Sequence, residues 1–115
     1  SATLRDYGRF GQFMLDDGVV DGVRLLPAGW SREAGSAKSL RDGTKLPYGY
    51  MWWIPQSDAA TRDHAYVAEG IHGQFVYINP AARVVIVVWS ALPKPTGGGV
   101  FDDMIVFDAI VEALR

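Results

Sequence analysis

The chain has 115 residues, of which 49% are hydrophobic and 21% charged, and its formal net charge is −2. This composition is typical of one globular domain with a modest core, which excludes a disordered tail and gives no electrostatic reason to expect nucleic acid or a membrane as partner. Cysteine is absent, which excludes disulfides, thiol nucleophiles and cysteine zinc sites and leaves the compartment open between cytoplasm and periplasm.

The first predicted element is an amphipathic helix over residues 4–16. Thr3 suits the N-cap, apolar residues recur at helical spacing from Leu4 to Met14, and Gly18 is a natural stop. Gly8 and Gly11 interrupt this helix, where each costs about 1 kcal/mol relative to Ala. We therefore expect both glycines to pack closely against another element.

A short extended piece is predicted at residues 23–26, followed by a brief helix from Pro27 to about Glu33 and a surface loop over 35–47. Aromatic and β-branched residues then predict four strands. These strands span residues 48–54, 64–70, 74–78 and 84–90, and the polar stretch 56–63 lies between the first two.

Two of these strands indicate how the sheet is buried. The strand 74–78 alternates, with Phe75 and Tyr77 on one face and Val76 and Ile78 on the other. The strand 84–90 is apolar on both faces, so both faces of the sheet must be covered. A last helix begins after Asp102. The predicted fold class is therefore α+β, an antiparallel meander of about four strands with flanking helices.

The strand 84–90 comes last in the meander, so one of its edges is predicted to be unpaired. It contains neither proline nor charge between Val84 and Trp89. Natural proteins protect such edges, which otherwise aggregate. We therefore expect a partner there, either another segment of the same protein or a second subunit.

Four common catalytic and nucleotide-binding motifs are absent, and a formal Tyr-x-Asn match at residues 77–79 lies in a strand that runs into a hairpin, where a core tyrosine is expected. No serine has lysine three positions on, and there is no Gly-x-Ser-x-Gly, P-loop or dinucleotide fingerprint. His64 and His72 are the only histidines, and their spacing matches no zinc motif. The sequence therefore predicts no cofactor and no metal.

Two features remain as candidate sites. In residues 69–74, EGIHGQ, glycine permits a bend that can leave a backbone N–H pointing into a cleft, as an oxyanion hole requires. An ordinary turn or bulge would use the same residues. Trp52 and Trp53 face opposite ways if extended, so either both pack in a core or one of them lines a cleft.

Several segments together resemble the serine β-lactamase-like hydrolases over essentially the whole chain. The resemblance is closest to the branch of 6-aminohexanoate-dimer hydrolases and esterases, which is related to class C β-lactamases and DD-peptidases. It rests on ATLRDYGRFGQ (2–12), LLPAGW (25–30), YGYMWW (48–53), AEGIHGQ (68–74), Asn79-Pro80 and the strand 84–88.

The resemblance implies an acyl-enzyme mechanism in which the serine of Ser-x-x-Lys attacks an amide or ester carbonyl. It also implies that residues 1–115 are a single domain, the C-terminal portion of a larger hydrolase whose nucleophile, lysine and catalytic tyrosine lie upstream. We expect this chain to be inactive alone. The alternative is a non-enzymatic interaction domain of the same fold that binds through its sheet edge.

One functional element carries over by position. Ala68-Glu69-Gly70 replaces the family's Lys-Thr-Gly-like triplet, so the next residue, Ile71, would donate its backbone N–H to the oxyanion hole. The missing lysine implies an esterase or amidase rather than recognition of a β-lactam carboxylate. The substrate-binding candidates are Ala68, Glu69, His72 and Trp52, with His72 as a cleft-wall residue rather than the general base.

Overall fold

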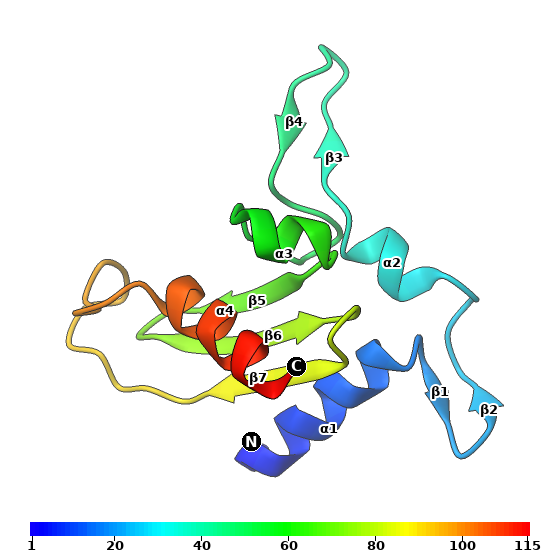
Figure 1. Ribbon diagram of the computed structural model, residues 1–115, viewed down its shortest axis with the longest axis horizontal. Helices are drawn as coiled ribbons and strands as arrows, with labels where there is room; N and C mark the ends of the chain where they lie inside the picture. Colours follow the sequence, from blue (N-terminus) through cyan, green and yellow to red (C-terminus); the bar gives the residue numbers. More distant parts are fainter.

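A three-stranded antiparallel sheet in the order β5-β6-β7 forms the centre of the computed structural model, which describes residues 1–115 (Figure 1). The strands are β5 (Tyr66–Gly70), β6 (Gln74–Asn79) and β7 (Val84–Val88). In the register, Tyr77 of β6 lies opposite Val67 of β5 and Ile86 of β7. The three later predicted strands are thus confirmed, and so is the α+β class.

One helix covers each face of this sheet. Helix α4 (Asp103–Leu114) places Phe107 against Tyr77, with 5.2 Å between ring centroids, and against Phe75 at 5.5 Å. Helix α1 (Leu4–Leu15) lies on the opposite face, where Met14 shares a core with Val76 and Ile78. The alternation predicted for β6 is therefore confirmed, because its odd and even residues enter two separate cores.

Helix α1 begins and packs largely as predicted. Thr3 is the N-cap and forms a capping box with Asp6. The Thr3 hydroxyl accepts the backbone N–H of Asp6, and the Asp6 carboxylate accepts the backbone N–H of Thr3. A Cβ on Gly11 would lie 2.4 Å from Cγ1 of Val85, so glycine is needed for helix and strand to approach. A Cβ on Gly8 would meet nothing within 4 Å, so the expectation of close packing is wrong for this residue.

Residues 48–54 do not form the predicted strand. Only two isolated bridges occur there, Tyr48 with Trp53 and Trp53 with Val67. The N–H of Gly49 bonds the carbonyl of Trp52, which closes a tight turn, and Met51 within it has a φ of 68°. A Cβ on Gly49 would lie 1.9 Å from the carbonyl oxygen of Ala34. The turn and this close contact override the β propensity of the aromatic residues.

The remaining elements are short. They are β1 (Val19–Val20), β2 (Val23–Arg24), α2 (Trp30–Ala34), β3 (Lys38–Ser39), β4 (Lys45–Leu46) and α3 (Asp58–Arg62). Helix α2 starts at Trp30 rather than Pro27 because Gly29, with a φ of 79°, is its N-cap. The predicted loop 35–47 contains the β3–β4 hairpin, and the polar stretch 56–63 contains α3, capped by Ser57.

A buried polar cluster ties the end of α4 to the sheet. The Asp63 carboxylate, 3% exposed, accepts hydrogen bonds from Asn79 at 3.0 Å, from Arg62 at 3.1 Å and from Arg115. Desolvation raises the pKa of Asp63, but the hydrogen bonds from Asn79 and Arg62 and the charges of Arg115 and Arg62 outweigh it, so the pKa is lowered.

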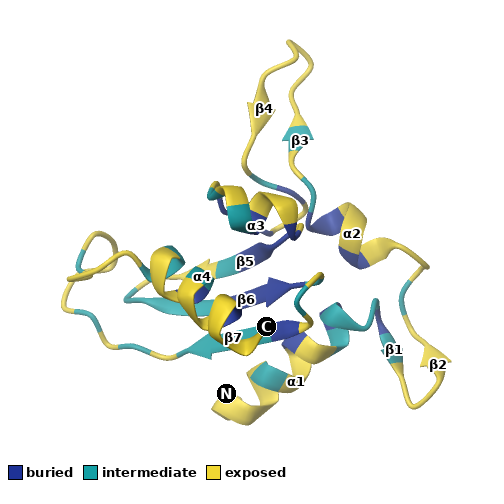
Figure 2. Cartoon of the chain, viewed as in Figure 1, coloured by how far each residue is buried: buried dark blue, intermediate teal, exposed yellow.

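Strand β7 has a neighbour on one side only, as predicted. Burial is also uneven along the sheet, since Tyr66 and Ile78 at one end are buried while Gly70 and Gln74 at the other are not (Figure 2). The hairpin turn between β5 and β6 therefore lies at the open end of the sheet.

None of the helices has the length and apolar character needed to cross a membrane.

Candidate functional site

The hairpin turn Ile71-His72-Gly73 connects β5 to β6, with Gly70 paired to Gln74 at its base. His72 and Gly73 both have positive φ, 62° and 84°. A Cβ on Gly73 would lie 2.8 Å from Cδ1 of Leu92. Glycine at 73 is thus required both by its backbone conformation and by the loop that packs against it.

The loop that follows β7 fixes this turn through backbone hydrogen bonds. The N–H of His72 donates to the carbonyl of Pro95 at 2.9 Å, and the N–H of Leu92 donates to the carbonyl of His72 at 3.1 Å. Nδ1 of His72 lies 2.7 Å from the carbonyl oxygen of Leu92. His72 therefore braces the turn with its ring and backbone.

Gln74 adds a second set of bonds. Its side-chain amide donates to the carbonyls of Ser90 and of His72, the latter at 3.2 Å, and its side-chain oxygen accepts the N–H of Ser90 at 3.2 Å. We call these bonds the Gln74 clamp. The sequence argument missed this residue, and the only available signal was its place directly after the glycine-bounded turn.

Ile71 and Gly73 are the turn residues whose backbone N–H groups donate to no atom of the chain. His72, between them, is bonded through both its N–H and its carbonyl. Ile71 itself is 64% exposed. The structure therefore presents an unpaired N–H donor on a turn that is braced on its other side.

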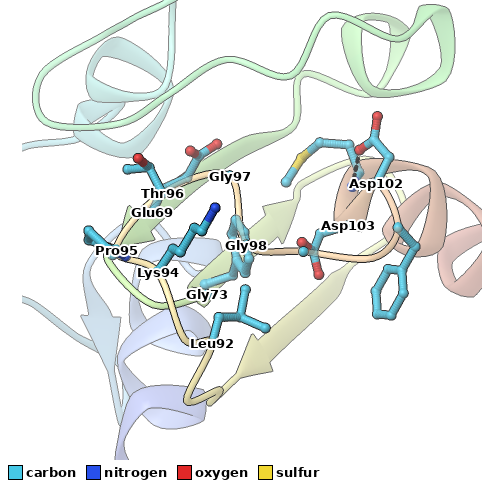
Figure 3. Close-up of a pocket in the computed structure, with 15 residues that line it drawn as sticks. Glu69, Gly73, Leu92, Lys94, Pro95, Thr96, Gly97, Gly98, Asp102 and Asp103 are labelled. Atoms are coloured by element: carbon cyan, nitrogen blue, oxygen red, sulfur yellow. Dashed lines mark hydrogen bonds between the residues drawn. The ribbon is translucent and has the colours of Figure 1, made fainter.

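A hollow of about 410 Å³ lies on the α4 side of the turn. Figure 3 shows the Lys94 side chain extending into it, with Glu69 and Thr96 on one side and Asp103 on the other. Partial burial, together with the negative charge of Asp103, raises the pKa of Glu69. The Gly97-Gly98 backbone closes the outer wall of this hollow.

A second hollow, of about 470 Å³, lies on the α1 side of the sheet. Ala68, Gly70 and Gln74 line it from the hairpin, and Tyr7 and Trp89 line it from α1 and the end of β7. Of the predicted substrate-binding residues, Ala68 lines only the second hollow, whereas Glu69 lines both hollows beside the turn.

Trp52 lies apart from this region. It is 7% exposed and packs between Phe10, at a ring distance of 6.2 Å, and Tyr66, at 5.0 Å. It lines neither hollow beside the turn, whereas Trp53 is 46% exposed and lines another hollow of about 380 Å³. The second of the two alternatives for this pair therefore holds, with Trp53 rather than Trp52 as the residue that lines a hollow.

The Beta-lactamase family matches residues 1–110 of this chain. The chain is 34% identical over 107 residues to the 6-aminohexanoate-dimer hydrolase of Paenarthrobacter ureafaciens, a match that covers 83% of this chain and 26% of that protein. A candidate 6-aminohexanoate-dimer hydrolase from Bacillus anthracis has a similar solved structure, with a TM-score of 0.79 and 29% identity. That match covers 98% of this chain and 29% of the other.

The chain thus spans between a quarter and a third of the length of these two relatives, since it covers 26% of one and 29% of the other. The predicted resemblance is confirmed in sequence and in structure along nearly the whole chain. The fold, the family match and the two relatives agree, and the chain belongs to the beta-lactamase family of serine hydrolases.

Proposed function

We propose that this chain supplies the oxyanion-hole strand of a serine hydrolase that cleaves amide or ester bonds through an acyl-enzyme. The observation that carries the proposal is the free N–H of Ile71 on a braced turn at the open end of the sheet. Such a donor, aimed at the oxygen that becomes negative in the transition state, contributes about 10²–10³-fold in kcat. Gly70, before it, allows close approach of the backbone.

The nucleophile in this proposal comes from outside residues 1–115, because no Ser-x-x-Lys occurs in them. An N-terminal segment of the same protein would bring the serine and lysine to the hollow beside Ala68 and Gly70. The chain alone would then be inactive. The free edge of β7 would pair either with a strand of that segment or with a second copy of the chain.

The substrate-contacting residues follow from the same geometry. Ala68 places a small neutral side chain where the family has lysine, which favours an amide or ester that lacks a carboxylate at that point. Glu69, which lines the same hollow as Ala68 as well as the one on the α4 side, would also contact the substrate, and His72 would hold the turn. Contact with Trp52 would require this buried side chain to move. The names of the two relatives, both hydrolases of the 6-aminohexanoate dimer, favour an amide substrate.

The test removes the backbone N–H group of residue 71 by substitution. Ile71→Pro removes the N–H, and Ile71→Val keeps it. Both are assayed with p-nitrophenyl esters in the chain combined with a polypeptide that carries Ser-x-x-Lys. We expect Ile71→Pro to lose about 100-fold or more in kcat and Ile71→Val to stay within about threefold.

Circular dichroism checks that both variants fold. Full activity in a folded Ile71→Pro variant would refute the oxyanion role, and turnover by the rigorously pure 115-residue chain would refute the claim of inactivity.

A second candidate function, a non-enzymatic domain that binds through its sheet edge, is favoured by one observation, the unpaired edge of β7. It predicts a stable, cooperatively unfolding monomer or defined dimer that needs no other polypeptide. Native mass spectrometry separates the two proposals. A co-purifying segment with Ser-x-x-Lys supports the hydrolase, and a stable, cooperatively unfolding monomer without such a segment supports the interaction domain.

A further inference from the structure

A third hollow lies at the opposite end of the sheet from the hairpin turn. Its volume is about 270 Å³, and it is enclosed by the end of α1, by α2, by the first residue of β5 and by the turn between β6 and β7. Figure 1 shows these elements meeting at the end of the sheet where β5 begins. No residue of the candidate active site contributes to it.

Ser31 is the unusual residue in this hollow. It is 7% exposed, and its hydroxyl has no hydrogen-bond partner although it is buried. Its backbone N–H, by contrast, bonds the Asp17 carboxylate at 3.0 Å. A buried hydroxyl without a partner costs about 1–3 kcal/mol. Such groups are rare in native proteins, and a bound water, ion or small molecule is one way in which their hydrogen bonding is completed.

The charges around Ser31 indicate what that molecule would be. The Asp17 carboxylate is already paired, because it accepts from the N–H of Gly29 at 2.7 Å, from that of Ser31 at 3.0 Å, and from Arg24 at 3.1 Å. Arg32 also lines the hollow, and its guanidinium makes no ion pair or hydrogen bond within the chain. The uncompensated charge in the lining is therefore positive.

Tyr66 adds a second hydroxyl. The residue is 1% exposed, and its hydroxyl makes only a long hydrogen bond, 3.5 Å, to the carbonyl of Met14. Burial raises the pKa of Tyr66 to about 12, against a smaller opposing effect of the Ser31 side chain beside it, so the hydroxyl keeps its proton near neutral pH. Met14, Leu15 and Pro80 supply an apolar wall.

We propose that this hollow binds a small carboxylic acid with a short aliphatic chain. The Arg32 guanidinium and the Ser31 hydroxyl would hold the carboxylate, since planar guanidinium groups match carboxylates in geometry. The Tyr66 hydroxyl would turn its single proton from the Met14 carbonyl to the carboxylate, and the aliphatic chain would lie against Leu15 and Pro80. This site is separate from the hairpin turn and does not depend on the proposed hydrolase activity.

The test is an NMR titration of the 115-residue chain with butyrate, with butyramide as the neutral probe of the same shape and inorganic phosphate as a different anion. We expect saturable shifts in the amide signals of Ser31 and Arg32 and in the ring signals of Tyr66 with butyrate. Butyramide and phosphate should bind at least tenfold more weakly.

Two variants and one control make the result specific. Arg32→Gln should weaken butyrate binding at least tenfold, and Ser31→Ala should weaken it severalfold. The control, Arg5→Gln, removes an exposed arginine that does not line this hollow and forms no ion pair, so it should leave binding unchanged.

Absence of saturable shifts with butyrate, equal affinity for butyramide, or unchanged binding in a well-folded Arg32→Gln variant would each overturn the proposal.

Discussion

Replacing Gly8 and Gly11 by alanine, one at a time, tests how α1 is attached to the sheet. Both residues lie inside the same helix and both are glycine, but their surroundings differ. A Cβ at position 8 would meet nothing within 4 Å, whereas a Cβ at position 11 would lie 2.4 Å from Cγ1 of Val85. The pair therefore separates helix propensity from packing.

The expected magnitudes follow from these distances. Alanine in place of glycine stabilises a helix interior by about 1 kcal/mol, and Gly8→Ala should gain close to that amount. In Gly11→Ala the same gain is opposed by overpacking against Val85, which costs about 1–3 kcal/mol. The two variants should thus differ by about 1–3 kcal/mol in the free energy of unfolding, with Gly11→Ala the less stable.

Urea unfolding, followed by tryptophan fluorescence and by circular dichroism, measures both values. A third variant, Val85→Ala, removes the atom that the new Cβ would meet. In that background Gly11→Ala should be neutral or stabilising, which gives a coupling energy of about 1 kcal/mol or more. Equal stabilisation by the two alanines, or the absence of coupling with Val85, would refute the packing of α1 on β7 at Gly11.

Three further predictions concern the polar cluster and the hairpin. Asp63→Asn should lower the free energy of unfolding by about 1–3 kcal/mol at pH 7. The folded-state pKa of Asp63 lies below its ordinary value of 3.8, so the stability that its charge adds is present above that pH and is lost as pH falls through the folded pKa. The free energies of unfolding of wild type and variant, measured by urea unfolding, should therefore converge in acid. Gly73→Ala should destabilise more than Gly22→Ala, since both have positive φ but only Gly73 is crowded, by Leu92; equal losses in thermal unfolding would contradict this. The pKa of Glu69 is raised in the folded state, so its ionisation lowers the free energy of unfolding as pH rises above 4.5. Glu69→Gln should therefore reduce the pH dependence of stability between pH 4 and pH 7, as measured by thermal unfolding.

The sequence predicts those parts of the fold in which many residues repeat one pattern. The alternation of β6 predicts two cores, and the apolar character of β7 predicts that both its faces are covered; both hold because a strand side chain has only two directions available. The start of the last helix after Asp102 is also confirmed, because the Asp102 carboxylate accepts the N–H of Met104 at 2.9 Å and caps α4.

The failures occur where a few long-range contacts decide the conformation. The aromatic segment 48–54 turns back at Gly49 because the carbonyl of Ala34 lies against it, a contact that no local pattern contains. The β1–β2 hairpin is different, since Asp21-Gly22 between two valine-containing pairs is a recognised turn signal that the sequence argument passed over. The hairpin turn was predicted as a candidate site, but the Gln74 clamp depends on a loop sixteen residues away in sequence.

The Gln74 clamp also sets an order of events during folding. Because its partner is Ser90, the clamp can close only after β6 and β7 have paired and the chain beyond β7 has turned back. The geometry around the Ile71 amide is therefore acquired late, after the loop-closure entropy of the second hairpin has been overcome. Hydrogen exchange at the His72 and Leu92 amides then reports when this chain has finished folding, rather than when its core has collapsed.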